Sequence, residues 1–348
     1  MMRYTQNPLY PLLLIVAFAF TLSGCDQESL PELQKFGGTA QGTTYHISYW
    51  TKKPIELPAV TKLVEDELHR LDKLLSNYRN DSEIEQFNAK VGSETQTVNQ
   101  EIISLIKQAR AVSEASNGCY DLTIKPLFDL WGFKGDKLTL PDNAALQKTL
   151  TQIGFKQLNI IDETRLRKIN PELKIDLSSI AQGYSVGRIA KLLEQQGIED
   201  YLVEIGGELQ TRGKKPDGQH WRIALEKPLS GQRTLQKVVT VQRTEPLAMM
   251  TSGTYRHYFD LDGKRYSHIL DAKTGRPVEH TTVSVTVFHH DPTQADAWST
   301  ALLCLGKAQG LLAANQAGIA ALFIQMDREI YNEYSSDALK TLKEIEIK

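Results

Sequence analysis

Residues 283–305 read VSVTVFHHDPTQADAWSTALLCL and join two kinds of secondary structure across a short polar turn. The β-branched run at 283–288 predicts a strand, and the apolar run at 295–305 predicts a helix. Both patterns recur along the chain without a regular strand–helix–strand alternation. The sequence therefore predicts an α+β fold, with mixed sheets and packed helices in two closely associated subdomains.

The same two patterns appear on both sides of this segment. Alternating or β-rich runs predict strands at residues 43–50, 201–205, 221–225 and 238–241. Apolar spacing predicts helices at residues 100–115 and 184–196. A longer helix is predicted upstream, with one apolar face made of Val60, Leu63, Val64, Leu68, Leu71, Leu74 and Leu75.

The N-terminus has the features of an export signal. Arg3 is followed by an apolar stretch at residues 9–22 and by the small-residue sequence Leu-Ser-Gly-Cys that ends at Cys25. This apolar stretch is shorter than the ~20 residues that a spanning helix needs. We expect residues 1–24 to be removed as a lipoprotein signal peptide and Cys25 to carry acyl chains, because the preceding residues resemble a lipobox. An ordinary secretory cut is the alternative.

Residues 25–36 are then expected to be the lipidated cysteine and a polar tether, and residues 37–348 the globular domain. Asp26 resembles the retention signal of inner-membrane lipoproteins in enteric-type bacteria. This resemblance implies a lipid-anchored protein on the periplasmic side of the cell inner membrane.

The overall charge excludes one class of partner. The chain has 40 basic and 42 acidic residues and no cluster of basic residues, which argues against nucleic-acid binding. Beyond Cys25 only Cys119 and Cys304 remain, too few for a disulfide framework and without metal-ligand spacing. They are expected to be small buried apolar side chains, and the sequence does not decide whether they are bonded.

A histidine stands before a glycine-bearing turn in the segment YSHILDAKTGRP, residues 266–277, which follows Ser252-Gly253. Residues 271–275 form an ordinary turn signal and say nothing about catalysis. His268 is a candidate general base near neutral pH. A hydrogen-bonded structural histidine is the alternative.

A carboxylate and a hydroxyl are four residues apart at the start of the predicted helix. Asp296 and Thr300 share one helical face, so both can point at one hard cation. Oxygen ligands without Cys or paired His favour Mg²⁺ or Ca²⁺ over zinc. Asp296 could instead cap the helix or favour its dipole.

Two further segments combine polar and small residues. In IDLSSIAQGY, residues 175–184, a strand predicted at 175–177 passes into a helix, and the small residues would let an anion approach the helix N-terminus. In EIGGE, residues 204–208, a strand ends in paired glycines, which tight packing explains equally well.

Together these segments resemble the FAD:protein FMN transferase family, the ApbE lipoproteins, over nearly all of the chain after the signal. The most specific matches are residues 268–271 (HILD) with Thr274-Gly275, and residues 295–297 (ADA) with Thr300. The resemblance implies the ApbE-like, T-fold-like architecture. Earlier matches in family order are residues 42–45 (GTTY), 76–78 (SNY) and 117–121 (NGCYD).

The resemblance implies a transferase of the EC 2.7.1 type. Such enzymes cleave the pyrophosphate of FAD with Mg²⁺ and join FMN to a Thr or Ser hydroxyl of an acceptor protein, with AMP leaving. It implies that Asp296 and Thr300 bind the metal, with contributions from Ser299 and from the backbone carbonyl of Ser179. It also implies that His268 is the base.

The resemblance further assigns a set of positions to the flavin nucleotide. Tyr78 could instead be a core aromatic residue, Asp176 could instead cap a helix, and Leu270 can act only through its backbone or apolar contact. Neutral Gln182 replaces a frequent Lys or Glu, so the phosphates have one less cation than in Lys-bearing relatives. The positions are Gln41, Tyr78, Cys119, Tyr120, Asp121, Asp176, Gln182 and Leu270.

The implied partners are FAD and membrane redox proteins. Expected acceptors are subunits of sodium-pumping NADH:quinone oxidoreductase or of Rnf-type complexes. Two alternatives are an FAD pyrophosphatase that yields free FMN and AMP, and a flavin-binding lipoprotein without catalysis. The presence of both Asp296 and His268 argues against a pure carrier, which needs neither.

Overall fold

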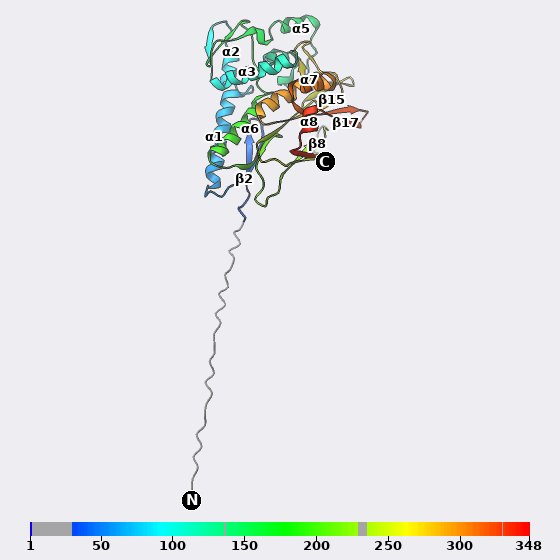
Figure 1. Ribbon diagram of the computed structural model, residues 1–348. Helices are drawn as coiled ribbons and strands as arrows, with labels where there is room; N and C mark the ends of the chain where they lie inside the picture. The colour runs from blue at the N-terminus through cyan, green and yellow to red at the C-terminus, as the bar shows by residue number, and fades with distance from the viewer. Residues whose placement is uncertain (2–29, 136, 229–234, 329) are drawn as a thin grey trace. The chain divides into compact units, whose positions relative to one another are not determined.

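The computed structural model describes residue 1 and residues 30–135, 137–228, 235–328 and 330–348 (Figure 1). Cys25, Asp26 and the expected cleavage site lie outside these residues. Pro31–Lys348 forms one compact unit, where the sequence led us to expect two subdomains. The α+β class is confirmed. In the described residues, no helix combines the length and the hydropathy that a membrane span requires.

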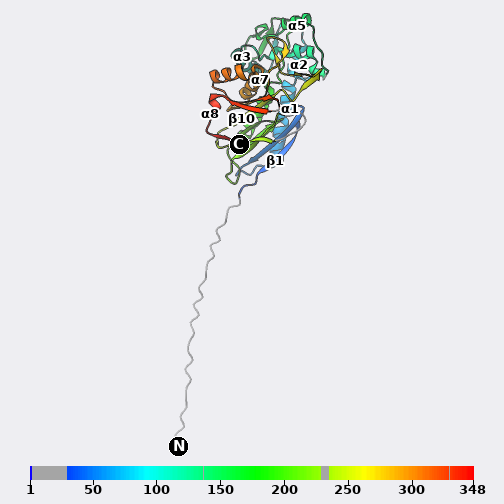
Figure 2. The same ribbon diagram turned by 90° about the vertical axis from the view of Figure 1, so that its right-hand side faces the viewer.

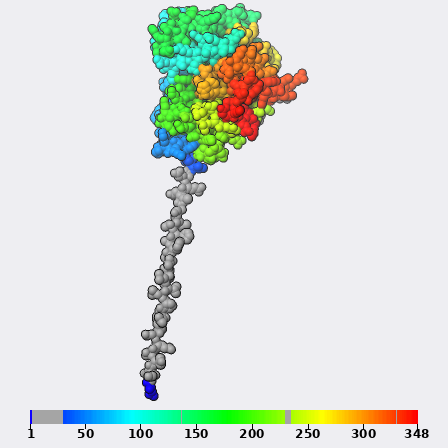
Figure 3. Space-filling view, in the orientation of Figure 1, coloured from blue at the N-terminus to red at the C-terminus, as the bar shows by residue number. Residues whose placement is uncertain are grey.

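An eight-stranded sheet is the centre of this unit, and every neighbouring pair of its strands is antiparallel. Its strand order is β1-β2-β6-β7-β10-β15-β16-β17, so β17 is an edge strand. Figure 3 shows the surface of β17 in red beside the orange surface of helix α7 (Pro292–Ala317). The strands are β1 (Gln34–Ala40), β2 (Thr43–Trp50), β6 (Asp200–Ile205), β7 (Glu208–Arg212), β10 (Leu247–Gly253), β15 (Thr282–His289), β16 (Ala320–Asp327) and β17 (Ile330–Ser335).

Strand β10 shows how the sheet buries both faces. Ala248 and Met250 belong to the larger core cluster, whereas Leu247 and Met249 belong to a second cluster. Successive side chains of a strand point to opposite faces, so an unbroken apolar run is required here.

Helices cover one face of the sheet. Helix α7 packs on β10 and β15, and α6 packs on β6 and β7 (Figure 1). Helix α1 packs against α6, and α3 against α7, which completes the larger core. The remaining bounds on this side are α1 (Leu57–Leu75), α2 (Glu83–Ala89), α3 (Gln100–Ala115) and α6 (Ala181–Gln195).

A small second sheet covers the other face. Trp221, Ile223 and Val239 from this sheet join Met249 and Phe288 of the main sheet in the second cluster. The C-terminal end of the chain belongs to this layer (Figure 2). Its elements are β8 (Trp221–Glu226), β9 (Leu235–Val241), β18 (Ile345–Ile347) and the short helix α8 (Asp337–Thr341).

A third cluster lies around Leu127, Trp131 and Leu270. The indole of Trp131 donates to the carbonyl of Gly275 at 2.7 Å, which holds the turn after His268 against this cluster. The remaining strands and α-helices are β3 (Thr95–Thr97), α4 (Lys125–Trp131), α5 (Asn143–Leu150), β4 (Leu158–Ile160), β5 (Arg165–Lys168), β11 (Tyr258–Leu261), β12 (Lys264–Ser267), β13 (Leu270–Asp271) and β14 (Arg276–Pro277), and three short 3-10 helices are η1 (Leu122–Ile124), η2 (Phe133–Gly135) and η3 (Phe155–Gln157).

Most predicted elements are confirmed, with two corrections near the N-terminus. Leu63 was expected on the buried face of α1 but is 38% exposed, because it lies at the margin of the apolar stripe. Residues 34–36 were expected in the tether but belong to β1. The ring of Phe36 packs against Tyr45 and Tyr49, and this contact holds the strand on the body.

Residues 175–177 do not form the strand that we expected directly before α6. The backbone there is held by side chains: Asn88 Oδ1 accepts from the Ile175 N–H at 2.7 Å, and Asn77 Oδ1 accepts from the Leu177 N–H at 2.6 Å. The amides of Asn77 and Asn88 also donate to the Ile175 carbonyl. Amide side chains thus replace a partner strand, and such bonds leave no periodic sequence signal.

Candidate active site

The predicted site residues converge on one cavity of about 300 Å³, which we call the main cavity. It lies where the end of β10, helix α7, the start of α6 and the segment around His268 meet. Of the predicted positions, only Gln41 and Ser299 are missing from its lining. The predicted residues that line it are Tyr78, Cys119, Tyr120, Asp121, Asp176, Ser179, Gln182, His268, Leu270, Asp296 and Thr300.

Asp296 is a buried carboxylate in the second turn of α7. The helix begins at Pro292 and is capped by Asp291, whose Oδ1 accepts from the Thr293 N–H at 2.8 Å. The capping alternative for Asp296 is therefore wrong. Its Oδ2 accepts instead from the Gly183 N–H of α6 at 2.7 Å, and burial raises the pKa of the carboxyl above its usual value.

Three hydroxyl groups contact one another where β10 meets α7. Ser252 Oγ at the end of β10 lies 2.8 Å from Ser299 Oγ and 2.9 Å from Thr300 Oγ1. Ser299 is fully buried and donates to the Asp296 carbonyl at 2.9 Å. Ser299 therefore supports the cavity wall from behind, while Ser252 and Thr300 line the cavity.

Glu208 lies in the segment 204–208 that the sequence analysis singled out, but it was not among the predicted site residues. It follows the Gly206-Gly207 turn between β6 and β7 and is only 8% exposed. Its Oε2 accepts from the Thr251 N–H at 2.8 Å. Burial raises the pKa of Glu208 well above its usual range, and the negative charge of Asp296 raises it further. A charged residue directly after paired glycines, at the first position of a largely buried strand, was the available signal.

These oxygen atoms form a donor set that suits a hard divalent cation. Two buried carboxylates, Asp296 and Glu208, face the same cavity as the hydroxyls of Ser252 and Thr300. Carboxylate and hydroxyl oxygens are ligands for Mg²⁺ and Ca²⁺, and a bound cation would remove the cost of burying two like charges. The residues present therefore fit the expected metal.

A second cluster with metal-ligand chemistry does not fit one. In the described residues, Cys119, Asp271 and Cys304 have potential ligand atoms within 4.8 Å of one another. Cys119 and Cys304 form a disulfide, however, so neither offers a thiolate. The sequence left their bonding open, and the fold decides it by bringing their Cα atoms to 6.1 Å from each other.

His268 has the protonation state of a base. Its Nδ1 lies 2.7 Å from the carbonyl oxygen of His257. A carbonyl only accepts, so Nδ1 carries the proton and Nε2 keeps a free lone pair. Burial lowers the pKa of His268 to about 4, so the ring is neutral at pH 7.

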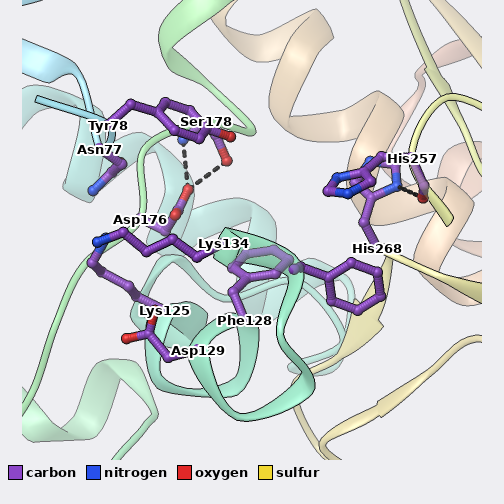
Figure 4. Close-up of a pocket in the computed structure, with 11 residues that line it drawn as sticks. Asn77, Tyr78, Lys125, Phe128, Asp129, Lys134, Asp176, Ser178, His257 and His268 are labelled. Carbon is purple, nitrogen blue, oxygen red and sulfur yellow. Dashed lines mark hydrogen bonds between the residues drawn. The ribbon is translucent and has the colours of Figure 1, made fainter. Parts of the chain in front are cut away.

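His268 also borders a smaller adjoining pocket of about 70 Å³, which we call the side pocket (Figure 4). Figure 4 shows Tyr78, Asp176 and Ser178 at one end of it and His257 and His268 at the other. Tyr78 is 80% exposed, so the core alternative for this residue is wrong. Its ring stands at the rim that both cavities share.

Asp176 does not cap a helix either. Helix α6 begins only at Ala181 and has no side-chain cap. The Asp176 carboxylate accepts from the backbone N–H of Ser178 at 2.9 Å and from the Ser178 hydroxyl, and burial raises its pKa. It faces both cavities as an acceptor.

Residues 119–121 line the main cavity beside Ser179. The Ser179 hydroxyl donates to the Tyr120 hydroxyl oxygen at 3.3 Å, and burial raises the pKa of Tyr120. Asp121 accepts from the Thr123 N–H and from the Phe155 N–H. Asp121 therefore fixes the local backbone as well as lining the cavity.

The two glutamines occupy different places. Gln41 has a positive φ of 52° and donates to Ser185 Oγ at 2.9 Å, and it lines a separate groove rather than the main cavity. Its expected flavin contact therefore has no support from its position. Gln182 does line the main cavity, and its amide donates to the Ile205 carbonyl at 2.6 Å.

Comparisons with known proteins show the family of this chain. The ApbE family model matches residues 41–323. The chain is 37% identical to the FAD:protein FMN transferase of Vibrio cholerae over 94% of its own length and 97% of that protein. It is 35% identical to the Salmonella typhimurium enzyme of the same name, over 94% and 95% of the two chains.

Solved structures give the same answer for the fold. The flavin transferase ApbE from Vibrio cholerae superimposes with a TM-score of 0.81 and 36% identity, over 89% of this chain and 99% of that one. The apo form of the flavinyl transferase ApbE of Pseudomonas stutzeri also superimposes with a TM-score of 0.81 and 36% identity, over 90% of this chain and 97% of that one.

Proposed function

We propose a metal-assisted phosphoester mechanism for this chain, which belongs to the ApbE family and acts as an FAD:protein FMN transferase. The observation that carries the mechanism is the meeting of Asp296, Thr300 and neutral His268 in one cavity. Such an arrangement can hold a cation against a pyrophosphate and place a base beside the attacking hydroxyl.

The cation is Mg²⁺, held by the side chains of Asp296 and Thr300 with the carbonyl of Ser179. Ser252 and buried Ser299 keep the Thr300 hydroxyl in place through the contacts of 2.9 and 2.8 Å. When bound, Mg²⁺ neutralises charge that develops on the pyrophosphate oxygens.

His268 removes the proton from the acceptor hydroxyl. Its Nδ1–H is held by the His257 carbonyl, which leaves Nε2 to accept that proton. The hydroxyl oxygen of an acceptor Thr or Ser then bonds to the FMN phosphorus, the pyrophosphate bond breaks, and AMP leaves. Tyr78, residues 119–121, Asp176, Gln182 and Leu270 hold the flavin nucleotide.

The reaction takes place on the periplasmic side of the inner membrane, with the chain anchored through lipid on Cys25. The disulfide between Cys119 and Cys304 supports an exported protein, because such bonds persist in oxidising compartments. A tether to the same membrane raises the effective concentration of membrane-bound acceptors. The acceptors are subunits of sodium-pumping NADH:quinone oxidoreductase or of Rnf-type complexes.

One experiment tests the mechanism. The purified chain is incubated with FAD, Mg²⁺ and a purified acceptor subunit, after which acceptor mass and AMP are measured. We expect an acceptor mass increase that corresponds to FMN, one AMP per modification, and loss of both with a chelator. AMP release with an unmodified acceptor would contradict phosphoester transfer, and full activity with the chelator would contradict the metal.

A further inference from the structure

The main cavity is lined by more acidic than basic side chains, although the proposed substrate carries negatively charged phosphates. Four carboxylates line it, those of Asp121, Asp176, Glu208 and Asp296. Among the described lining residues, Arg256 is the one side chain that is cationic at every physiological pH. A pyrophosphate that enters this cavity therefore meets one protein cation, in addition to any bound metal.

Arg256 is positioned by the turn that carries Glu208. One guanidinium N–H donates to the Gly206 carbonyl over a long 3.5 Å, and the Glu226 carboxylate is 4.0 Å away. A Cβ added to Gly207, whose φ is +100°, would lie 3.2 Å from Arg256 Nη2. Glycine at this position therefore lets the guanidinium lie close against the turn. The guanidinium has five N–H groups, so these contacts and its hydrogen bond with Tyr255 still leave donors for a ligand.

The other position that could bear a cation is already engaged. Gln182 is neutral, and its amide donates to the Ile205 carbonyl at 2.6 Å. This bond uses one of the two amide N–H groups, and the amide carries no positive charge. In the lining of the main cavity, Arg256 is therefore the protein cation that can bind phosphate.

We propose that Arg256 binds the pyrophosphate of the flavin dinucleotide at the mouth of the main cavity. This inference rests on the proposed function, which places FAD in that cavity. The planar guanidinium can donate two parallel N–H groups to phosphate oxygens, which a lysine ammonium cannot reproduce. Its side chain is 42% exposed, so it meets the ligand at the entrance while Asp296 lies within.

The test is calorimetric titration of the full chain with ADP and with adenosine, both in Mg²⁺. In Arg256→Gln we expect the Kd for ADP to rise roughly 10- to 100-fold and the Kd for adenosine to stay unchanged, because only ADP carries the phosphates. Arg256→Lys should give an intermediate Kd for ADP. Transferase assays should show a higher KM for FAD with kcat changed less.

Arg265→Gln is the matched control, since Arg265 is 44% exposed and pairs with Asp260 on a hairpin outside the cavity. It should leave both Kd values unchanged. An unchanged Kd for ADP in Arg256→Gln would overturn the proposal, as would equal weakening of ADP and adenosine, which indicates a structural role. A wild-type chain that does not bind ADP would instead contradict the proposed function.

Discussion

Cys119 and Cys304 are joined by a disulfide although 185 residues separate them in the sequence. The bond ties the segment that includes Tyr120 and Asp121 to helix α7, which carries Asp296 and Thr300. Two walls of the main cavity, one expected to bind nucleotide and one expected to bind metal, are thereby held together covalently.

Replacing Cys304 with Ser should lower the free energy of unfolding by about 2–5 kcal/mol, because the open chain regains the entropy of a long loop. Urea unfolding with and without a reductant measures this. The reductant should destabilise the wild-type chain and leave the variant unchanged. Equal midpoints for wild type in both conditions would show that the bond contributes nothing.

Asp296 and Asp291 provide a matched pair of acidic residues on one helix. Asp296→Ala should abolish Mg²⁺-dependent transfer and weaken Mn²⁺ binding, because it removes the buried carboxylate from the cavity. Asp291→Ala should cost about 1 kcal/mol of stability through loss of the cap while Mn²⁺ binding persists. Mn²⁺ binding followed by electron paramagnetic resonance separates the two effects. Normal Mn²⁺ affinity in Asp296→Ala would exclude Asp296 as a ligand.

His268→Ala should slow the single-turnover rate of FMN transfer by roughly 10²- to 10⁴-fold, the usual contribution of a general base. The Kd for FAD should change far less, because His268 acts on the acceptor hydroxyl. Rapid-quench measurement of modified acceptor gives the rate, and equilibrium titration gives the Kd. A normal rate in the variant would remove His268 as the base.

The pH dependence follows from the lowered pKa of His268, which is about 4. Protonated Nε2 cannot accept a proton, so the acid limb of the rate should lie near pH 4 rather than near 6.5. His268 binds a proton more readily in the unfolded chain than in the folded one. Its contribution to the free energy of unfolding is therefore fully present above pH 6.5 and is lost as the pH falls toward 4. Single-turnover rates between pH 4 and 8 test the first statement, and a midpoint near 6.5 would contradict it.

Gly183 is required where α6 and α7 cross. A Cβ at this position would lie 2.3 Å from the Pro292 carbonyl oxygen and 2.5 Å from Asp296 Cβ. Gly183→Ala should therefore cost about 1–3 kcal/mol or more and displace Asp296. Gly135→Ala is the control, because no atom lies within 4 Å of its added methyl. Thermal unfolding of both variants measures the difference, and equal melting temperatures would contradict the close packing.

Local periodicity accounts for the elements that could be predicted. Strand β2 and helix α3 have the predicted bounds, because alternation and helical spacing each reflect a face buried by neighbours. The apolar helix predicted to end at residue 305 stops at a break within α7, where Gly306 has a φ of 69°. The strand predicted at residues 175–177 does not form, because amide side chains rather than a neighbouring strand bind the backbone there.

The sequence by itself determined the α+β class, the family resemblance and the pairing of Asp296 with Thr300, because each depends on spacing within one element or on a local motif. Only the tertiary structure decided that Glu208 and Arg256 belong to the same cavity, that Cys119 and Cys304 are bonded, and that Gln41 lies elsewhere. These relationships depend on strand register and helix packing between distant segments. The pairing of β7 with β10 brings Thr251 to the Glu208 carboxylate, and no local pattern encodes that contact.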